Sequence, residues 1–487
     1  MIFGTGIGGN IIQGNHIGVG ASGLDSVIGS EIGISLINAP ANLIGGTLEV
    51  DRNVIWGSTG GINMIGAGAT GNIIQGNYFG TDATGTNPIP GSGVAIGMLG
   101  APANLIGGTS AGARNLINGN GIGMIGAGTT GNIIQGNYFG MDATGTNPIP
   151  GSEVAIAMLD APANLIGGTS DGARNVINGK GIGMIGAGTT GNIIQGNYLG
   201  LDTTGTIPIP GSRSGVMLLN APANLIGGTS DGARNVISGS TGPNITVVGP
   251  ESTGNIIQGN YLGLDATGTN RTAVGGNNVG IFIDGAPANK IGGSEGGARN
   301  VISGHSVAEI LVGGSGATSN VIQGNYLGVD ATGSNPVPGS FVGIFISGAT
   351  ANLIGGLHPG DGNLIGGDSV AGIFLSSAGT SDNSIQGNFV GVNATGTNAT
   401  LGNAIGIFVL SGASINKIGG ANAGQGNLVA GNSIAQISIE GAGSSFNMVQ
   451  GNFVGVDATG ASVVAGGTGI LIGGGCFGKL HRRQQCR

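Results

Sequence analysis

Hydrophobic residues occur along this chain in short runs, and each run is closed by glycine, asparagine or another turn residue. One stretch reads Gly-Ile-Gly-Met-Ile, then Asn-Ile-Ile-Gln, then Asn-Tyr-Phe-Gly. Apolar runs this short, bounded by turn residues, predict β-strands. Such short strands cannot stand alone, so each must pair with a counterpart elsewhere in the chain.

The segment Gly-Asn-Ile-Ile-Gln-Gly-Asn recurs, with small changes, eight times at steps of 60 to 65 residues. A second segment, commonly Asn-Leu-Ile-Gly-Gly, alternates with it, so each unit consists of two unequal half-units. Two asparagines stand five residues apart in the first kind, as Asn72 and Asn77 do, and eleven apart in the second, as Asn104 and Asn115 do. Fixed spacings between variable loops indicate a repeat architecture with constrained corners.

If each strand pairs with its counterpart in the next half-unit, about 4.8 Å away, the chain winds into a three-sided coil of parallel sheets. Leucine-rich repeats need longer helices and propeller blades need antiparallel hairpins, so neither fits. We predict an all-β fold: a single parallel β-helix solenoid of about fifteen three-stranded coils. It would span residues 1–474, with residues 475–487 as an off-pattern basic tail that holds both cysteines.

The exceptions in the repeat show which side chains face outward. The position after the first asparagine of a half-unit is usually Ile or Leu but becomes Lys290, Ser384 and Lys417, whereas the next position stays Ile or Val. The first position therefore faces solvent and the second, for example Ile74 or Ile106, faces the core.

The recurring asparagines are predicted to form ladders, in which a side-chain amide at each corner hydrogen-bonds to the amide of the next coil. Asparagine and glycine also tolerate the left-handed backbone that a corner requires. The predicted structural ladder includes Asn72, Asn77, Asn104, Asn115, Asn132 and Asn137.

Composition supports this fold and excludes others. Glycine accounts for 111 of 487 residues, which disfavours helices, yet it does not fall on every third position as in collagen. Hydrophobic residues at 39% and a mean hydropathy of +0.29 are too high for a disordered polymer. The net charge of −8 argues against a nucleic-acid partner, and the lack of an 18-residue apolar run argues against a membrane span.

The pattern Asn-x-Ile-x-Gly-Asn-x-Ile-Gly, with Asp-Ala-Thr-Gly-Thr loops and Gly-Ala-Arg-Asn-Val-Ile-Ser-Gly segments, resembles right-handed parallel β-helix repeat proteins of the bacterial secreted and surface type. These belong to the pectate-lyase-like superfamily. The resemblance covers residues 1 to about 474 and implies right-handed winding. It says little about function, because this superfamily includes lyases, hydrolases, epimerases, adhesins and spacers.

Charged residues are too sparse for the carboxylate clusters of the superfamily's enzymes, so we predict no catalytic residue, no metal and no cofactor. The repeated loop aspartates fit Asx-turns, with weak calcium binding as the alternative, and Asn393 replaces one of them. Repeated arginines before the second asparagine fit hydrogen bonds to loop carbonyls of the adjacent coil. The one neighbourhood worth searching for catalysis comprises Asp284, Lys290, Glu295, Arg299, His305 and Glu309.

An aromatic row is the most suggestive feature for binding. Its residues all follow the second asparagine of alternate half-units, and valine or leucine occupies the same position between them. Their spacing of about 9.6 Å suits stacking of a β-linked polysaccharide, unless the proline-containing loops bury the rings. An ice-binding surface is a third and weaker interpretation, because the threonines recur in loops of alternate coils and not in every strand. The row is Tyr78, Tyr138, Tyr198, Tyr261, Tyr326, Phe389 and Phe453.

These observations predict a non-catalytic extracellular or cell-surface rod, adhesin-like or carbohydrate-contacting, whose partner is a polysaccharide or cell-surface glycan. A polysaccharide lyase, hydrolase or epimerase of the same superfamily is the alternative. The start, Met1 to Ile7, lacks the regions of a signal peptide and enters mid-pattern, so we expect a piece of a larger polypeptide. Neither terminus reads as a polar cap, which predicts head-to-tail self-association or fraying.

Overall fold

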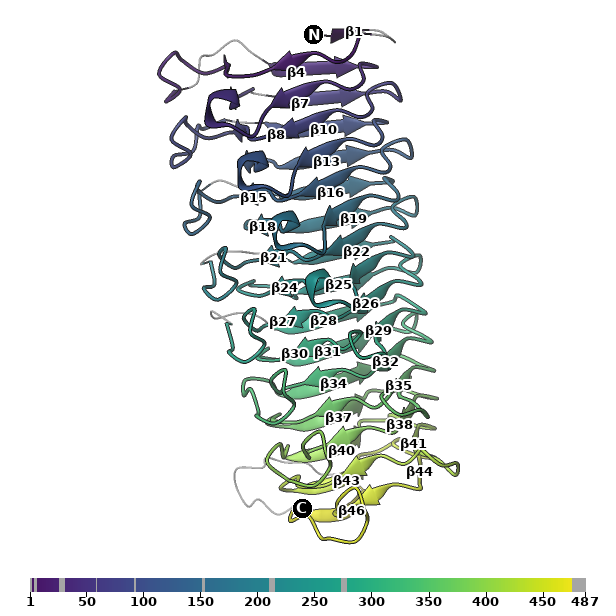
Figure 1. Ribbon diagram of the computed structural model, residues 1–487. Coiled ribbons are helices and arrows are strands. Elements are labelled where there is room, and N and C mark those ends of the chain that lie inside the picture. The colour runs from purple at the N-terminus through teal and green to yellow at the C-terminus, as the bar shows by residue number, and fades with distance from the viewer. Residues whose placement is uncertain are drawn as a thin grey trace. The chain divides into compact units, whose positions relative to one another are not determined.

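Each coil contains three short strands, one in each of three parallel sheets, called A, B and C below (Figure 1). The computed structural model describes residues 2–3, 7–25, 31–57, 59–91, 93–150, 154–209, 215–272 and 278–474. The chain folds as a parallel β-helix of about fifteen three-stranded coils, as its sequence predicts. The basic tail predicted at residues 475–487 lies outside the described residues.

Contacts divide the chain into two compact units, each described by itself. The first comprises residues 1–246, 251–266 and 272–277, and the second comprises 247–250, 267–271 and 278–487. The three-stranded coil predicted from the sequence recurs in both units. Four short 3-10 helices precede arginines in the first unit: Glu49–Asp51, Ala111–Ala113, Asp171–Ala173 and Asp231–Ala233.

Sheet A has the longest strands. Its strands in the first unit are β1 (Ile2–Phe3), β4 (Ile32–Ile37), β7 (Gly60–Ile65), β10 (Val94–Leu99), β13 (Ile122–Ile125), β16 (Ile156–Leu159), β19 (Ile182–Ile185) and β22 (Val216–Leu219). Strand β25 (Ile245–Val248) contributes residues to both units. Its strands in the second unit are β28 (Val279–Asp284), β31 (Ala308–Gly313), β34 (Val342–Ser347), β37 (Ala371–Ser376), β40 (Ile405–Leu410), β43 (Ala435–Glu440) and β46 (Thr468–Gly473).

Sheet B consists of strands of two or three residues. Those of the first unit are β2 (Ile11–Ile12), β5 (Leu43–Gly45), β8 (Ile73–Gln75), β11 (Leu105–Gly107), β14 (Ile133–Gln135), β17 (Leu165–Gly167), β20 (Ile193–Gln195), β23 (Leu225–Gly227) and β26 (Ile256–Gln258). Those of the second unit are β29 (Lys290–Gly292), β32 (Val321–Gln323), β35 (Leu353–Gly355), β38 (Ser384–Gln386), β41 (Lys417–Gly419) and β44 (Met448–Gln450).

Sheet C consists of two-residue strands and carries the aromatic row. Those of the first unit are β3 (His16–Ile17), β6 (Val54–Ile55), β9 (Tyr78–Phe79), β12 (Leu116–Ile117), β15 (Tyr138–Phe139), β18 (Val176–Ile177), β21 (Tyr198–Leu199), β24 (Val236–Ile237) and β27 (Tyr261–Leu262). Those of the second unit are β30 (Val301–Ile302), β33 (Tyr326–Leu327), β36 (Leu364–Ile365), β39 (Phe389–Val390), β42 (Leu428–Val429) and β45 (Phe453–Val454).

The core consists of the inward residues of each strand, stacked in register from coil to coil. Ile106 pairs with Ile74 on one side and Ile134 on the other, and all three side chains are fully buried. The preceding residue faces outward, as the lysines at this position in other coils predict. Among the described residues, no helix has the length and hydropathy that a membrane crossing requires.

The asparagine ladders are present as predicted. Asn132 donates through Nδ2 to Oδ1 of Asn164 at 3.0 Å, and Asn137 donates to Oδ1 of Asn175 at 3.2 Å. The left-handed backbone, however, does not fall on these asparagines. At some corners it falls on the residue before the asparagine, such as Gly131 at φ 68°, whereas Arg174, before Asn175, has an ordinary φ of −64°. The ladder asparagine is therefore required for its amide, and where the corner needs a left-handed residue its neighbour supplies it.

Candidate functional site

The aromatic row lies along sheet C, where Tyr78 pairs with Leu116 and Leu116 pairs with Tyr138. The first three tyrosines are covered. Tyr78, Tyr138 and Tyr198 are 8%, 6% and 8% exposed. Of the two readings that the sequence leaves open, an exposed row or a row covered by loops, the covered one holds for these three rings.

Two kinds of cover account for this burial. Loop residues following sheet C pack on the rings, since Met141 and Ile209 form one cluster with Tyr78 and Tyr138, and Ala143 lies against it. The second cover is an arginine from the preceding coil. Its guanidinium carbon lies 3.9 to 4.2 Å from the ring centroid in five coils: Arg52 over Tyr78, Arg114 over Tyr138, Arg174 over Tyr198, Arg234 over Tyr261 and Arg299 over Tyr326.

These cation–π stacks revise the role predicted for the arginines. Arg299 also donates through Nε to the carbonyl oxygen of Gly324 at 3.3 Å, which is the kind of contact expected from the sequence. The stacking on tyrosine was not expected. Burial raises the pKa of the Tyr138 phenol, and the charge of Arg114 only partly opposes this. The ring therefore stays neutral beneath its cation.

The row changes character at its end in the second unit. Glycines Gly362 and Gly426 occupy the positions that hold arginine in the other coils, and Phe389 and Phe453 occupy the following aromatic positions. In two successive repeats, therefore, glycine replaces the arginine and phenylalanine replaces the tyrosine of the stacked pair. Phe389 is half-buried and Phe453 is 46% exposed.

A hollow of about 520 Å³ lies over this part of the second unit. Its polar side chains are Arg299 and His358, and its rings are Tyr326 and Phe389. The remaining wall is apolar side chains and glycine backbone: Gly356, Leu357, Pro359, Gly360, Gly362, Leu364, Gly387, Ala394, Gly424 and Gly426.

The cation of this hollow differs from three of its four counterparts in the first unit, since only Arg114 also has no acidic residue three positions earlier. Arg174 and Arg234 pair with Asp171 and Asp231, three residues earlier, at 2.7 Å. Glycine stands three residues before Arg299. The hollow thus combines a ring face, a guanidinium that has no acidic residue at this position, and exposed backbone polar groups.

The loop aspartates serve as turn formers. Asp142 accepts hydrogen bonds through Oδ1 from the Thr144 hydroxyl at 2.7 Å and from backbone amides of Thr146 and Asn147 at 3.2 and 3.3 Å. Partial burial would raise the pKa of Asp142, but these hydrogen bonds, with that of the Asn147 side chain, outweigh it and lower the pKa. Asn393 accepts equivalent bonds from Thr397 and Asn398. The turn reading is confirmed, although most of the backbone donors lie four and five residues on.

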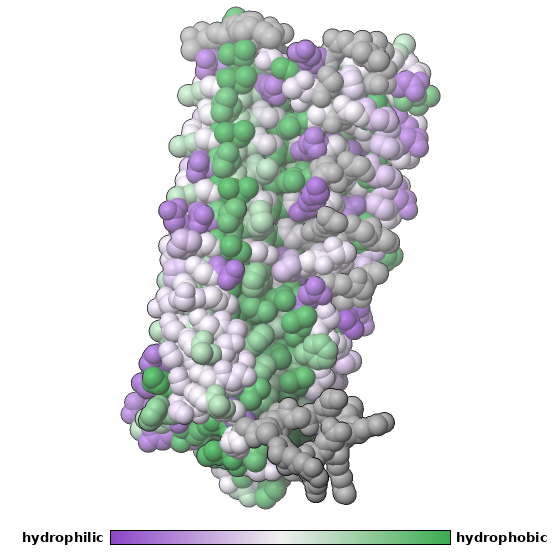
Figure 2. Space-filling view, turned by 180° about the vertical axis from the view of Figure 1, so that it is seen from behind, coloured by the Kyte–Doolittle hydropathy of each residue, from purple (hydrophilic) through white to green (hydrophobic). Residues whose placement is uncertain are grey.

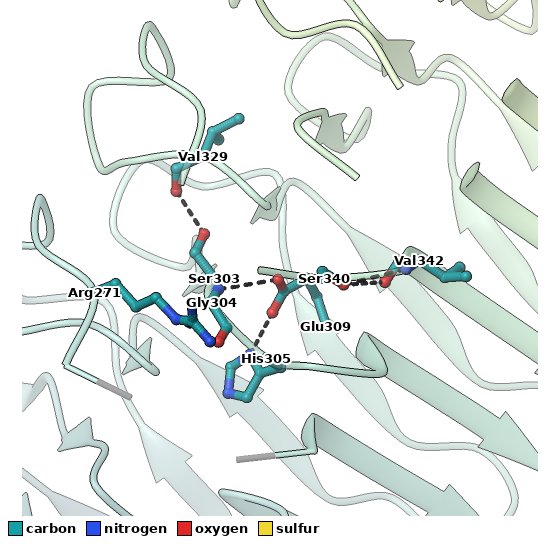
Figure 3. Close-up of polar contacts among 8 residues, drawn as sticks. All are labelled: Arg271, Ser303, Gly304, His305, Glu309, Val329, Ser340 and Val342. Carbon is teal, nitrogen blue, oxygen red and sulfur yellow. Dashed lines mark hydrogen bonds and ion pairs between the residues drawn. The ribbon is translucent and has the colours of Figure 1, made fainter. Parts of the chain in front are cut away.

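The polar neighbourhood singled out in the sequence does not converge. Asp284, Lys290 and Glu295 are exposed, whereas His305 and Glu309 are fully buried inside the second unit. The buried pair is in contact through His305 Nδ1 and Glu309 Oε2 (Figure 3).

The buried pair is closed off from solvent by its surroundings. Gly304 donates its amide to Oε1 of Glu309 at 3.1 Å, and Arg271 donates through Nε to the carbonyl oxygen of Gly304 at 2.9 Å (Figure 3). Burial raises the pKa of Glu309, against the opposing effect of His305. The pair is a satisfied element of the core.

Asp368 is a buried acid that the sequence reading missed. It is 3% exposed, and neither carboxyl oxygen has a hydrogen-bond partner among the described residues. Burial, and secondly the charge of Glu309, raise the pKa of Asp368 well above its ordinary value. The feature of the sequence that could have indicated this acid is its position shortly after a sheet C strand, where the polar residues Asn118 and Ser238 are also buried.

Comparisons with known proteins show no family. No family model matches the chain, and no curated protein matches it. Among solved structures, a TibC-catalysed hyper-glycosylated TibA fragment aligns at 10% identity and a TM-score of 0.25, over 91% of this chain and all of that one. The A-module of the Azotobacter vinelandii mannuronan C-5 epimerase AlgE6 aligns at 10% identity and a TM-score of 0.26, over 91% of each chain.

Proposed function

We propose that this chain is a non-catalytic extracellular or cell-surface scaffold that contacts a polysaccharide or cell-surface glycan through the hollow of its second unit. The observation that carries the proposal is Phe389, whose ring lines the hollow at a point where the covering arginine is replaced by Gly362. A sugar presents C–H groups from one ring face, and such a face stacks on an aromatic ring.

The dimensions of the hollow support a short stretch of glycan. Tyr326 pairs with Leu364 and Leu364 pairs with Phe389, so the two rings stand two coils apart. Two coils correspond to about 9.6 Å, roughly the repeat of a β-linked disaccharide, so a disaccharide stacked on Phe389 would reach the Arg299 guanidinium that covers Tyr326. Arg299 and the glycine backbone would then bind hydroxyl groups at the rim.

The non-catalytic part of the proposal rests on how the acids are used. The loop aspartates accept several hydrogen bonds from their own turns, and the His305–Glu309 pair is enclosed in the core. A catalytic acid or base must reach the proton it transfers. A polysaccharide lyase, hydrolase or epimerase remains the alternative function, and product formation distinguishes the two.

Two variants test the site. Phe389→Ala removes the stacking ring, and Ala394→Trp fills the hollow from its loop side. The parent protein is first applied to β-glucan and chitin columns. On whichever insoluble glycan retains the parent, both variants should lose retention. The control is Phe345→Ala, which removes a ring of sheet A in the same unit, outside the hollow, that stacks on Phe374 at 5.1 Å.

If the parent is retained and both hollow variants are retained equally well, the hollow is not the binding site. If the parent binds neither column, the proposed class of glycan is wrong. Incubation with soluble polysaccharides should yield no new reducing ends, no unsaturated product and no epimerised residues. Any of these products, lost on substitution of a single acid, would establish the enzymatic alternative.

A further inference from the structure

The outward face of sheet B in the first unit carries an unbroken aliphatic row. Each member is the first residue of its strand and pairs in register with the next, as Leu105 does with Ile73 and Ile133. Several are well exposed, from 36% at Ile133 to 65% at Ile11. The row is Ile11, Leu43, Ile73, Leu105, Ile133, Leu165, Ile193, Leu225 and Ile256.

A second aliphatic row runs beside it, across the corner, at the end of the sheet A strands. Leu99 pairs with Ile125, and Ile125 pairs with Leu159, and these three are 50%, 47% and 43% exposed. This row is Ile37, Ile65, Leu99, Ile125, Leu159, Ile185 and Leu219. Together the two form what is called the double row below.

The double row is almost free of charge. The third residue of the sheet B strands adds a parallel line of glutamine and glycine, such as Gln135 and Gly167. Two acidic residues, Asp160 and Glu251, lie at the corner beside it, and the Asp160 carboxylate accepts the amide of Gly188 at 3.0 Å. Figure 2 shows a continuous column of hydrophobic side chains over the first unit on this side of the molecule.

The same positions in the second unit are interrupted. The sheet B row there includes Lys290, Ser384 and Lys417, and the sheet A row includes Asp284 and Ser347. The fold thus accepts lysine at this position, since the backbone is the same. Uninterrupted aliphatic residues in the first unit are therefore not a requirement of the coil.

We propose that the double row is a lateral interface between two copies of this chain. Nine rungs at about 4.8 Å span about 40 Å, and a strip about 20 Å wide would cover about 800 Å² on each partner, the size of a standard interface. Contiguous apolar patches of this size mark interaction sites.

The surface suits a second copy better than an unrelated partner. A two-fold axis places the same patch on both sides, so a ridge of Ile and Leu at about 4.8 Å spacing meets a ridge of the same spacing. Neither surface brings an uncompensated charge into the contact, apart from Asp160 and Glu251 at its margin. The backbone of both sheets is already hydrogen-bonded between successive coils, so side-chain packing alone would join the copies.

Sedimentation velocity over a concentration series tests the interface. The parent should sediment as a dimer that dissociates on dilution. Ile133→Lys should raise the dissociation constant at least about a hundredfold, because an unpaired lysine would be buried in the contact. Leu353→Lys is the matched control, because it alters the same row in the second unit, between Lys290 and Lys417, and should leave the dimer unchanged. Thermal unfolding of both variants monitors the fold.

Cysteine cross-linking separates this contact from a head-to-tail one. With Cys476 and Cys486 replaced by serine, single cysteines are placed along the row from Ile73 to Leu225, and oxidation should link copies most efficiently near the two-fold axis. A parent that stays monomeric throughout the series overturns the proposal. So does a dimer that tolerates Ile133→Lys and forms no cross-link from any of these positions.

Discussion

The guanidinium of Arg299 lies over the ring of Tyr326, which stands on the following coil, at 3.9 Å from the ring centroid. Four other arginine–tyrosine pairs repeat this relationship in the first unit. Each pair joins two successive coils through side chains, in addition to the strand hydrogen bonds. Where both partners are absent, at Gly362 and Phe389, the hollow appears.

Arg114 and Tyr138 should be energetically coupled. Arg114 has Ala111 three residues earlier in place of an acid, so its stack on Tyr138 at 4.0 Å can be measured without a competing ion pair. A double-mutant cycle with Arg114→Ala and Tyr138→Leu should show a coupling of about 1 kcal/mol in urea unfolding. Strictly additive effects of the two single changes would contradict the stacking contribution.

Asn132→Leu should lower the free energy of unfolding by about 1 to 3 kcal/mol, because it leaves turn groups in two neighbouring coils without partners. The side chain of Asn132 accepts from Asn104 at 3.1 Å and donates to Asn164 at 3.0 Å. Asn120→Leu, at an exposed asparagine outside the ladders, is the control for the change in residue type. Equal stability of both variants would remove the ladder argument.

Asp368→Asn should flatten the pH dependence of stability. The folded protein holds the Asp368 proton at a pH where the unfolded chain, with its ordinary pKa of 3.8, has released it. The contribution of this group to the free energy of unfolding is therefore most favourable below that value and falls as pH rises toward the folded-state pKa.

Urea unfolding at a series of pH values checks this. The asparagine variant should gain stability relative to the parent as pH increases from about 4 to about 8. Ser35→Ala, at a buried serine of the first unit, controls for the loss of a buried polar group, because Ser340 itself acts on the pKa of Asp368. A difference between Asp368→Asn and the parent that does not change with pH would contradict the buried, protonated acid.

Asp142→Asn should cost little at neutral pH, because Asn393 forms the same turn in another coil. Asp142→Ala should cost about 1 to 2 kcal/mol through unpaired turn amides. The pKa of Asp142 is lowered in the folded state, so its contribution is present above the ordinary value of 3.8 and is lost as pH falls through the lowered pKa.

The melting temperature measured with calcium and with a chelator separates the turn role of Asp142 from a metal role. Equal melting temperatures are expected in both conditions. A calcium-dependent increase that Asp142→Ala reduces would revive the calcium alternative.

The fold was predictable because its constraints are local and periodic. The exceptions Lys290 and Lys417 identified the outward positions, and the fixed asparagine spacings identified the corners. Each coil repeats the solution of the one before it, so errors in a single loop do not change the architecture.

The candidate site was predictable only in part, because it depends on what lies over the aromatic row. Exposure of Tyr138 or Phe389 is decided by loops that vary and by an arginine on another coil. The joint loss of arginine and tyrosine at two repeats was visible in the sequence, but its meaning required the stacking geometry. Asp368 was missed because its signal in the sequence, a polar residue shortly after a sheet C strand, does not reveal that such positions are buried.

The ladders also bear on how such a gene can change length. Asn72 donates to Asn104, and Asn104 donates to Asn132, which stands 60 residues after Asn72 and enters the same kind of contact. Slippage during replication that duplicates or deletes one such unit would rejoin equivalent donors to equivalent acceptors. Alleles that differ by whole two-coil units should therefore fold alike, whereas alleles that differ by part of a coil should not.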